Sequence, residues 1–349
     1  MYKKIFMSIA AVAALTLVSC SSDDLNSLSD NSSKNEAISF DGYLGRSAVS
    51  VNGSRASELK IDDLKKPTEG FGVFGNYKKD DGTEFGSNLF NNVKVYWPSS
   101  PEPAKWKYDN TKYWPTEGHI DFLAYAPYEG ETSLKNNTSI DFTVEGDVAK
   151  QKDLLWANAK NQTMAKNSGE NKVKFTFNHA LAKIGYTVKT SAHDEGTTIK
   201  LNKITLAGSA DGTSNTAFYK KGTIDLSTGA WTSSTSEEKL NFEWFTNTSG
   251  KEVTTEATGN EPDNYLFVIP QKFSAAPATD ELYVIVEYTI QTGTTDMKSR
   301  VSSKITKEFE QGKAYTINLS LGLTPIEFDV EVVNGWVPAT DDININTWN

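Results

Sequence analysis

The sequence predicts an all-β fold with β-sandwich domains, because its apolar residues recur in short runs that turn-forming residues separate. In the clearest run, residues 326–333, apolar side chains alternate with three acidic ones. Such alternation indicates a strand with one buried and one solvent-facing side. Before residue 150 no long stretch has helical periodicity. Gly, Pro, Asn and Asp clusters bound the runs at the spacing typical of sandwiches.

Residues 1–19 have the features of a secretory signal peptide. Lys3 and Lys4 precede an apolar stretch over residues 5–17, and the small residue Ser19 comes before Cys20. The apolar stretch is shorter than the roughly 20 residues that a membrane-spanning helix requires. We therefore expect export, with cleavage after residue 19.

Cys20 is the only cysteine of the chain and is the predicted lipidation site. Cleavage before it would leave an N-terminal thiol that a bacterial lipoprotein pathway acylates, and several acyl chains anchor a protein to a membrane. The alternative is an ordinary signal peptide near which the cysteine falls by chance. A single cysteine excludes an internal disulfide.

The rest of the chain divides into a tether, two domains and a tail. Residues 20–36 are polar and too poor in apolar side chains to order themselves, so they predict a flexible tether. We expect an N-terminal sandwich over residues 37–188, a C-terminal sandwich over residues 189–337, and a tail over residues 338–349. The formal net charge of −10 disfavours nucleic acid as a partner.

Strands are expected throughout both domains, with a helical turn only at residues 59–65. Each strand is short and rich in aromatic or β-branched residues. The expected strands are 37–44, 70–77, 93–97, 120–125, 173–177, 184–188, 199–206, 265–269, 282–290, 301–305, 315–321 and 326–333.

No motif in the sequence predicts an enzyme, a cofactor or a metal site. His119, His179 and His193 are far apart and have no cysteine partners at zinc-binding spacing. Neither a nucleophile elbow nor a phosphate-binding glycine loop is present. We interpret His179, which lies beside apolar strands, as a hydrogen-bonded packing residue.

Aromatic residues gather between residues 97 and 114. Trp97, Trp106 and Trp114 could form a sugar-stacking platform, which would make the chain a carbohydrate-binding surface lipoprotein. Their strand-like, proline-punctuated neighbours favour the other interpretation, in which they fill the core of a sandwich.

Arginine is scarce, and its positions are informative. Of the 35 basic residues only Arg46, Arg55 and Arg300 are arginines, and the first two follow the expected strand 37–44. An Arg-specific protease would therefore have few sites, and exposed loops are cut most easily. Chance placement of two surface arginines is the alternative.

Six ordered landmarks make the chain resemble the fimbrillins of the Bacteroidetes, the subunits of type V pili. Ser54-Arg55-Ala56 also resembles the Thr-Arg-Ala element of that family. The landmarks are Tyr113-Trp114-Pro115 with Ile120 to Pro127, Asp153 to Ala157, Phe175 to Ile184, Leu266 to Gln271, and Gly312 to Leu319.

The resemblance implies two tandem transthyretin-like β-sandwiches of Greek-key type and a non-enzymatic role in adhesion. It implies export as a lipoprotein of the outer membrane, proteolytic trimming after Arg46 or Arg55, and assembly by strand exchange with other fimbrial subunits. A donor strand would then contain Ile343 and Ile345, and a ligand would lie on a host or bacterial surface.

Overall fold

The computed structural model describes twelve stretches of the chain, and residue contacts gather Glu36–Asn349 in one compact unit. Every element below lies in that unit. The described residues are 36–44, 59–66, 68–83, 89–99, 105–167, 172–191, 196–232, 238–260, 264–274, 280–322, 327–332 and 343–345.

The fold is all-β, as the sequence predicts. In the described stretches, helical structure is limited to the short turns α1 (Ile61–Leu64), η1 (Val148–Lys150) and η2 (Ala165–Asn167). α1 lies where the sequence predicts a helical turn, and its Leu64 is fully buried. The chain is therefore held together by sheets and by the cores between them.

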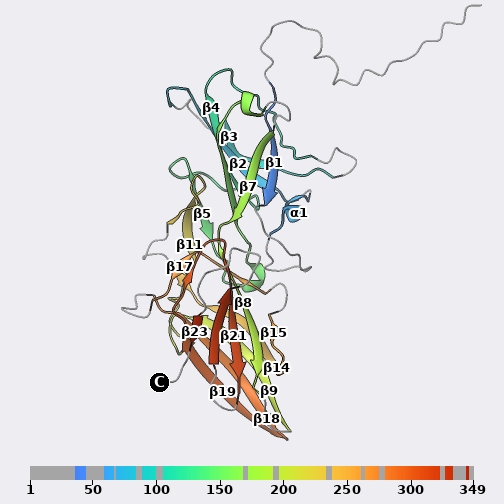
Figure 1. Ribbon diagram of the computed structural model, residues 1–349, viewed down its shortest axis with the longest axis vertical. Coiled ribbons are helices and arrows are strands. Elements are labelled where there is room, and N and C mark those ends of the chain that lie inside the picture. The colour runs from blue at the N-terminus through green and yellow to red at the C-terminus, as the bar shows by residue number, and fades with distance from the viewer. Residues whose placement is uncertain are drawn as a thin grey trace, which may run out of the picture. The chain divides into compact units, whose positions relative to one another are not determined.

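The first sheet has six strands in the order β1-β7-β6-β4-β2-β3. β1 runs parallel to β7 (Figure 1), whereas the other pairs are antiparallel. The strands are β1 (Ser39–Leu44), β2 (Phe71–Lys78), β3 (Phe90–Val95), β4 (His119–Ala126), β6 (Leu155–Gln162) and β7 (Lys172–His179).

Two further sheets of four or more strands are formed mainly by the second half of the chain. One has the order β14-β9-β18-β19; the other has the order β15-β8-β21-β22-β23, with β16 also paired to β8. Their strands are β8 (Ala182–Thr190), β9 (Thr197–Ala207), β14 (Phe242–Val253), β15 (Thr258–Gly259), β16 (Leu266–Val268), β18 (Tyr283–Thr292), β19 (Thr295–Lys304), β21 (Ala314–Leu321), β22 (Glu327–Val332) and β23 (Ile343–Ile345).

Three small sheets complete the described part. β12 (Trp231–Thr232), β11 (Lys221–Asp225) and β5 (Ser139–Thr143) form one of them, so strands from both halves of the chain pair there. The others pair β10 (Phe218–Tyr219) with β13 (Lys239–Leu240), and β17 (Gln271–Lys272) with β20 (Glu308–Phe309). Residues 188 and 189, the expected domain boundary, both lie in β8, and the boundary stays a prediction.

The first sheet is buried on both faces because alternate residues of its central strands enter two different cores. Phe71 of β2 and Phe122 of β4 lie in an aromatic core that is built from the first sheet and its loops. Phe74, three positions after Phe71, and Leu123, directly after Phe122, lie in a second core. All four side chains are almost completely buried.

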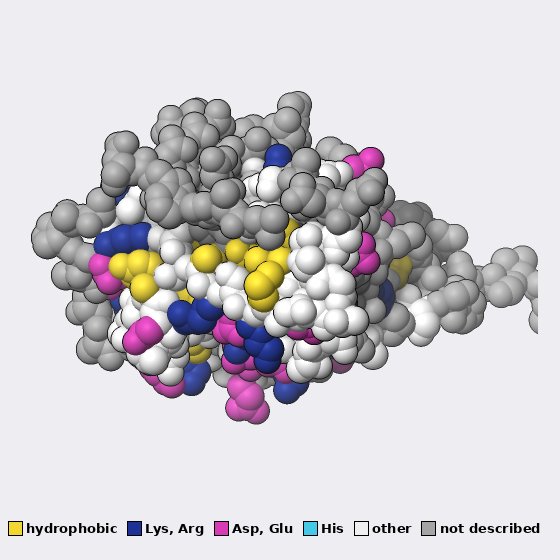
Figure 2. Space-filling model, turned by 90° about the horizontal axis from the view of Figure 1, so that it is seen from below, with side chains coloured by type: hydrophobic (Ala, Val, Ile, Leu, Met, Phe, Trp, Pro, Cys, Tyr) yellow, Lys and Arg dark blue, Asp and Glu magenta, His cyan; other side chains and the backbone are white. Residues whose placement is uncertain are grey.

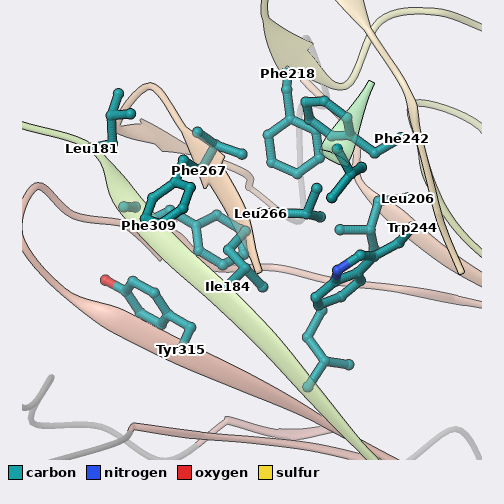
Figure 3. Packing of buried hydrophobic residues seen from close by; sticks show 14 of the residues in the cluster. Leu181, Ile184, Leu206, Phe218, Phe242, Trp244, Leu266, Phe267, Phe309 and Tyr315 are labelled. Atoms are coloured by element: carbon teal, nitrogen blue, oxygen red, sulfur yellow. The ribbon is translucent and has the colours of Figure 1, made fainter. Parts of the chain in front are cut away.

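Most members of the second core come from residue 180 onward. Figure 3 shows Ile184 from β8, Phe267 from β16 and Tyr315 from β21 in this cluster. Phe309 packs edge to face on Tyr315, with 5.0 Å between the ring centroids. Because this core also contains Phe74 and Leu123, it joins the first sheet to the second half of the chain.

Candidate assembly site

β1 is an edge strand of the first sheet, and it is the segment that precedes Arg46 and Arg55. Its partner along one side is β7, in a parallel register from Ser39 opposite Lys172 to Leu44 opposite Phe177. On the other side, the main-chain bonds among the described residues reach only the residues just before β1. Ile38 donates its N–H to the Lys112 carbonyl at 2.8 Å, and Trp114 donates to Glu36 at 3.0 Å.

The side chains of β1 and of the residue before it alternate between core and surface. Ile38, directly before β1, and Phe40 are 2% and 3% exposed, whereas Tyr43 is 49% exposed. Phe40 lies in the aromatic core, and its ring has four aromatic neighbours with centroids 5.3–5.7 Å away: Phe90, Tyr108, Phe122 and Phe175. A single side chain of an edge strand thus completes the core.

Gly42 allows β1 to approach β7 closely. A Cβ at this position would lie 3.3 Å from an atom of the Phe177 ring, which is tighter than ordinary van der Waals contact. The backbone conformation is unremarkable, so the glycine serves contact and not a turn. The inward positions 38, 40 and 42 thus hold Ile, Phe and Gly in succession, and the core beneath them leaves little room for a side chain at position 42.

Tyr108 connects β1 to the loop beside it. Its hydroxyl donates to the Ile38 carbonyl at 2.7 Å and accepts the Lys112 N–H at 3.1 Å. Burial raises the pKa of this phenol above its ordinary value. The hydroxyl is therefore a fixed, neutral donor for a strand that occupies the position of β1.

The described structure resumes at Leu59, next to the buried side chains of Asp153 and His179, which are hydrogen-bonded to each other. The Asp153 carboxylate accepts the Leu59 N–H at 3.2 Å and lies 2.7 Å from Nδ1 of His179, with its Oδ2 serving both contacts. Both side chains are buried. The interpretation of His179 as a hydrogen-bonded packing residue is confirmed, and Asp153 ties the segment after residues 45–58 to the sheet.

The predicted site residues are only partly placed. Cys20, Arg46 and Arg55 lie outside the described residues. Ile343 and Ile345 lie in β23, whose backbone pairs antiparallel with β22 in a register that sets Val330 opposite Ile343 and Phe328 opposite Ile345. The structure does not bring these two isoleucines and β1 together in one sheet.

The tryptophan platform that the alternative interpretation requires is not formed. Trp106 and Trp114 are 6% and 2% exposed and belong to the aromatic core, while Trp97 packs edge to face on Trp106. The expectation that these residues fill a core is confirmed for the first two. A sugar cannot stack on rings that other side chains cover.

Sequence reasoning missed Tyr108 and Asp153 as parts of the site. Tyr108 lies within the aromatic interval, but only the register between β1 and its neighbours shows that its hydroxyl meets Ile38. Asp153 begins one of the landmarks, Asp153 to Ala157. Its position directly before an apolar run could have identified Asp153 as a buried hydrogen-bond acceptor.

The described residues contain no group of three or more His, Cys, Asp or Glu arranged to hold a metal ion. In the same stretches, no helix has the length and apolar character needed to cross a membrane.

Comparison with known proteins places this arrangement in a family. A sequence profile of fimbrillin-like proteins matches residues 55–336. A fimbrial protein from Bacteroides vulgatus aligns with 22% identity and a TM-score of 0.65, over 86% of this chain and 99% of that one.

A second solved structure has the same fold at lower similarity. It is a proposed cell adhesion protein from Bacteroides ovatus, with 14% identity and a TM-score of 0.50, over 87% of this chain and 99% of that one. No curated protein sequence matches the chain. Because the fimbrillin-like profile covers most of the sequence, the chain belongs to the fimbrillin-like family.

Proposed function

We propose that the chain is a subunit of a cell-surface fimbria that serves adhesion. Family membership supports this role, and the buried edge strand β1 is the observation that carries the mechanism. In the proposal the chain has no enzymatic activity. Residues 1–19 direct export, Cys20 carries the lipid anchor at the outer membrane, and residues 20–36 act as a tether.

The precursor is cut after Arg46 or Arg55 by an Arg-specific protease, and β1 then leaves. Loss of Phe40 would open the aromatic core along the free side of β7, where a row of main-chain groups also becomes available. A donated strand gains hydrogen bonds along such an edge and buries alternate side chains in the vacated pockets. Asp153 holds the new chain start near Leu59 in place.

The proposed donor is the tail, residues 338–349, with Ile343 and Ile345 as the residues that enter the groove of a neighbouring subunit. Two transthyretin-like sandwiches over residues 37–188 and 189–337 form the body of each subunit. Because donor and groove are different surfaces, the contact is head-to-tail and does not close, and it produces a filament.

An Arg-specific protease tests this proposal on the purified full-length chain. Cutting should separate the fragment with β1 from the rest and give oligomers that electron microscopy shows as filaments. Arg46→Gln and Arg55→Gln, singly and together, identify the cut that matters. Arg300→Gln is the matched control, because Arg300 lies within the paired strand β19.

Two results would contradict the proposed strand exchange. If the cut chain retains the β1 fragment through gel filtration under native conditions, cutting does not open the groove. If the cut chain without residues 338–349 assembles like the parent, the tail is not the donor.

A further inference from the structure

A hollow of about 560 Å³ lies on the sheet β14-β9-β18-β19, and polar side chains line it. Two irregularities in neighbouring strands form it. Asn202 is an extra residue of β9, because Lys203 pairs with Glu287 whereas Leu201 pairs with Tyr288. β14 leaves the β9 register between Thr246 and Lys251. Such bulges re-aim side chains and occur next to binding sites.

The register arranges four basic side chains around the centre of the hollow. Thr289 of β18 lies opposite Lys200 of β9 on one side and Lys298 of β19 on the other. One step along β18, Glu287 lies between Lys203 and Arg300 in the same way. Each set of three opposite residues forms a row across the strands, one centred on Thr289 and the other on Glu287. Positions 287 and 289 share a face of the sheet, so both rows line the hollow.

Hydrogen bonds fix the floor of the hollow. Thr289, which is 9% exposed, donates its hydroxyl proton to Oδ1 of Asn202 at 2.8 Å. Nδ2 of Asn202 donates to the Asn247 carbonyl at 3.3 Å, and Oδ1 of Asn247 accepts the Ser249 N–H at 3.0 Å. The floor is thus a connected polar network across β18, β9 and β14, with a shape that is set before any ligand arrives.

The two rows differ in how their charges are compensated. Lys203 forms an ion pair with Glu243 at 2.7 Å, and Arg300 lies 3.8 Å from Glu287 while donating to the Asp211 carbonyl. Within the described stretches, Lys200 and Lys298 have no carboxylate within ion-pair distance. Glu252 of β14 lies opposite Lys200 in the register but forms no ion pair with it, so Lys200 and Lys298 can both contact a ligand anion.

The hollow's excess of basic side chains contrasts with the rest of the molecule. The formal net charge of the chain is −10, and Figure 2 shows basic and acidic side chains interspersed on the face that it presents. Lys200 and Lys298 lie on the two strands that flank β18, roughly 10 Å apart by the spacing of strands in a sheet. An anionic group held between them, above Thr289, would be attracted by both ammonium groups.

We propose that the hollow binds a carboxylated sugar, such as a sialic acid or uronic acid unit of an acidic glycan. The sugar carboxylate lies between Lys200 and Lys298. Sugar hydroxyls donate to Asp296 and Glu287 and accept from Thr246 and Ser249, which also line the hollow. The volume is within the range of small-molecule sites.

The two acidic side chains of the hollow exclude denser anions. Glu287 and Asp296 repel the multiple charges of a nucleic acid or a polysulfated chain, whereas they match the hydroxyl hydrogens of a sugar. A ligand with one carboxylate and several hydroxyls is complementary to both features. The site contains no residue of β1, β22 or β23, so it operates independently of strand exchange.

Binding is tested by NMR titration of the full-length chain with two acidic probes, 3′-sialyllactose and a hyaluronan tetrasaccharide, and with lactose as the uncharged comparison. At least one acidic probe should bind and lactose should not. Lys200→Gln with Lys298→Gln should weaken binding at least tenfold, and added salt should weaken it too. Lys189→Gln, an exposed lysine of β8, should leave it unchanged.

Several outcomes would overturn the proposal. They are no binding of either acidic probe, equal binding of lactose, and unchanged affinity in the double variant. The double variant should unfold at the same temperature as the parent, because neither lysine forms an ion pair within the described stretches. This control separates loss of the site from loss of the fold.

Discussion

At the scale of single residues, the proposed role of β1 depends most on the side chain of Phe40. It belongs to an edge strand, yet it fills the space between four aromatic rings. The sequence predicted only that it lies in a strand, residues 37–44. It could not predict the neighbours, because they come from segments about 50 to 135 positions away that only the sheet pairing brings together.

Phe40→Ala should lower the free energy of unfolding of the intact precursor by about 3–5 kcal/mol, the usual cost of removing a buried phenylalanine. Tyr43→Ala, on the exposed side of the same strand, should change it by about 0.5 kcal/mol or less. Urea unfolding measures both. Equal effects of the two substitutions would mean that β1 is not a structural part of the core.

Tyr315 gives a prediction about pH. Burial raises the pKa of its hydroxyl to about 12 from the ordinary value of 10. The folded protein then holds the proton more tightly than the unfolded chain, so this stabilisation is complete below pH 10 and is lost as the pH rises toward 12.

Tyr315→Phe should therefore make the free energy of unfolding fall less steeply between pH 10 and pH 12 than it does in the parent. Urea titrations at half-unit intervals measure the slope. Tyr283→Phe serves as the control, since its side chain is only partly buried in β18. Parallel slopes for Tyr315→Phe and the parent would contradict the assignment.

At the scale of elements, the sequence predicted strands well where alternation was clean. β22 occupies residues 327–332 of the expected 326–333, and β16 ends before Pro270, as the missing N–H of proline dictates. The sequence analysis missed β14. Its middle contains Asn247, Ser249 and Gly250, which are turn-forming residues, and the strand departs there from its register with β9.

The candidate site was less predictable than the strands. Arginine positions indicated where a cut would fall, but Arg46 and Arg55 lie outside the described residues. The parallel pairing of β1 with β7 and the role of Tyr108 depend on long-range register, which local sequence does not encode. β6 was missed for a related reason: its residues from Lys160 to Gln162 are polar, and two of its three buried positions are the small residues Ala157 and Ala159.

A synthetic peptide of residues 338–349 tests the tail as an element. The recipient is a chain without residues 338–349 that an Arg-specific protease has cut. The peptide should raise the unfolding temperature of this chain, because it fills the groove that β1 has left. It should leave the intact precursor unchanged, because β1 still occupies that position. The same peptide with Ile343 and Ile345 replaced by Asp should have no effect on either form.

At the scale of the whole molecule, the first sheet is shared between two cores. Its central strands send Phe71 and Phe122 into the aromatic core and Phe74 and Leu123 into the second. Removal of β1 opens only the aromatic core. The second core still joins the first sheet to the strands after residue 180, so we expect the rest of the chain to keep its fold when β1 is removed.

The most direct test of strand exchange is a disulfide between subunits. In a Cys20→Ser chain, one cysteine replaces Ile343 and another replaces Lys174 of β7, which lies opposite Asp41 of β1. A parallel set places the second cysteine at Thr176, and a control places it at Lys189 of β8. After cutting by the Arg-specific protease and mild oxidation, the β7 variants should give a ladder of disulfide-linked oligomers. A ladder that forms equally before cutting, or with Lys189→Cys but not with the β7 cysteines, would contradict exchange of the tail for β1.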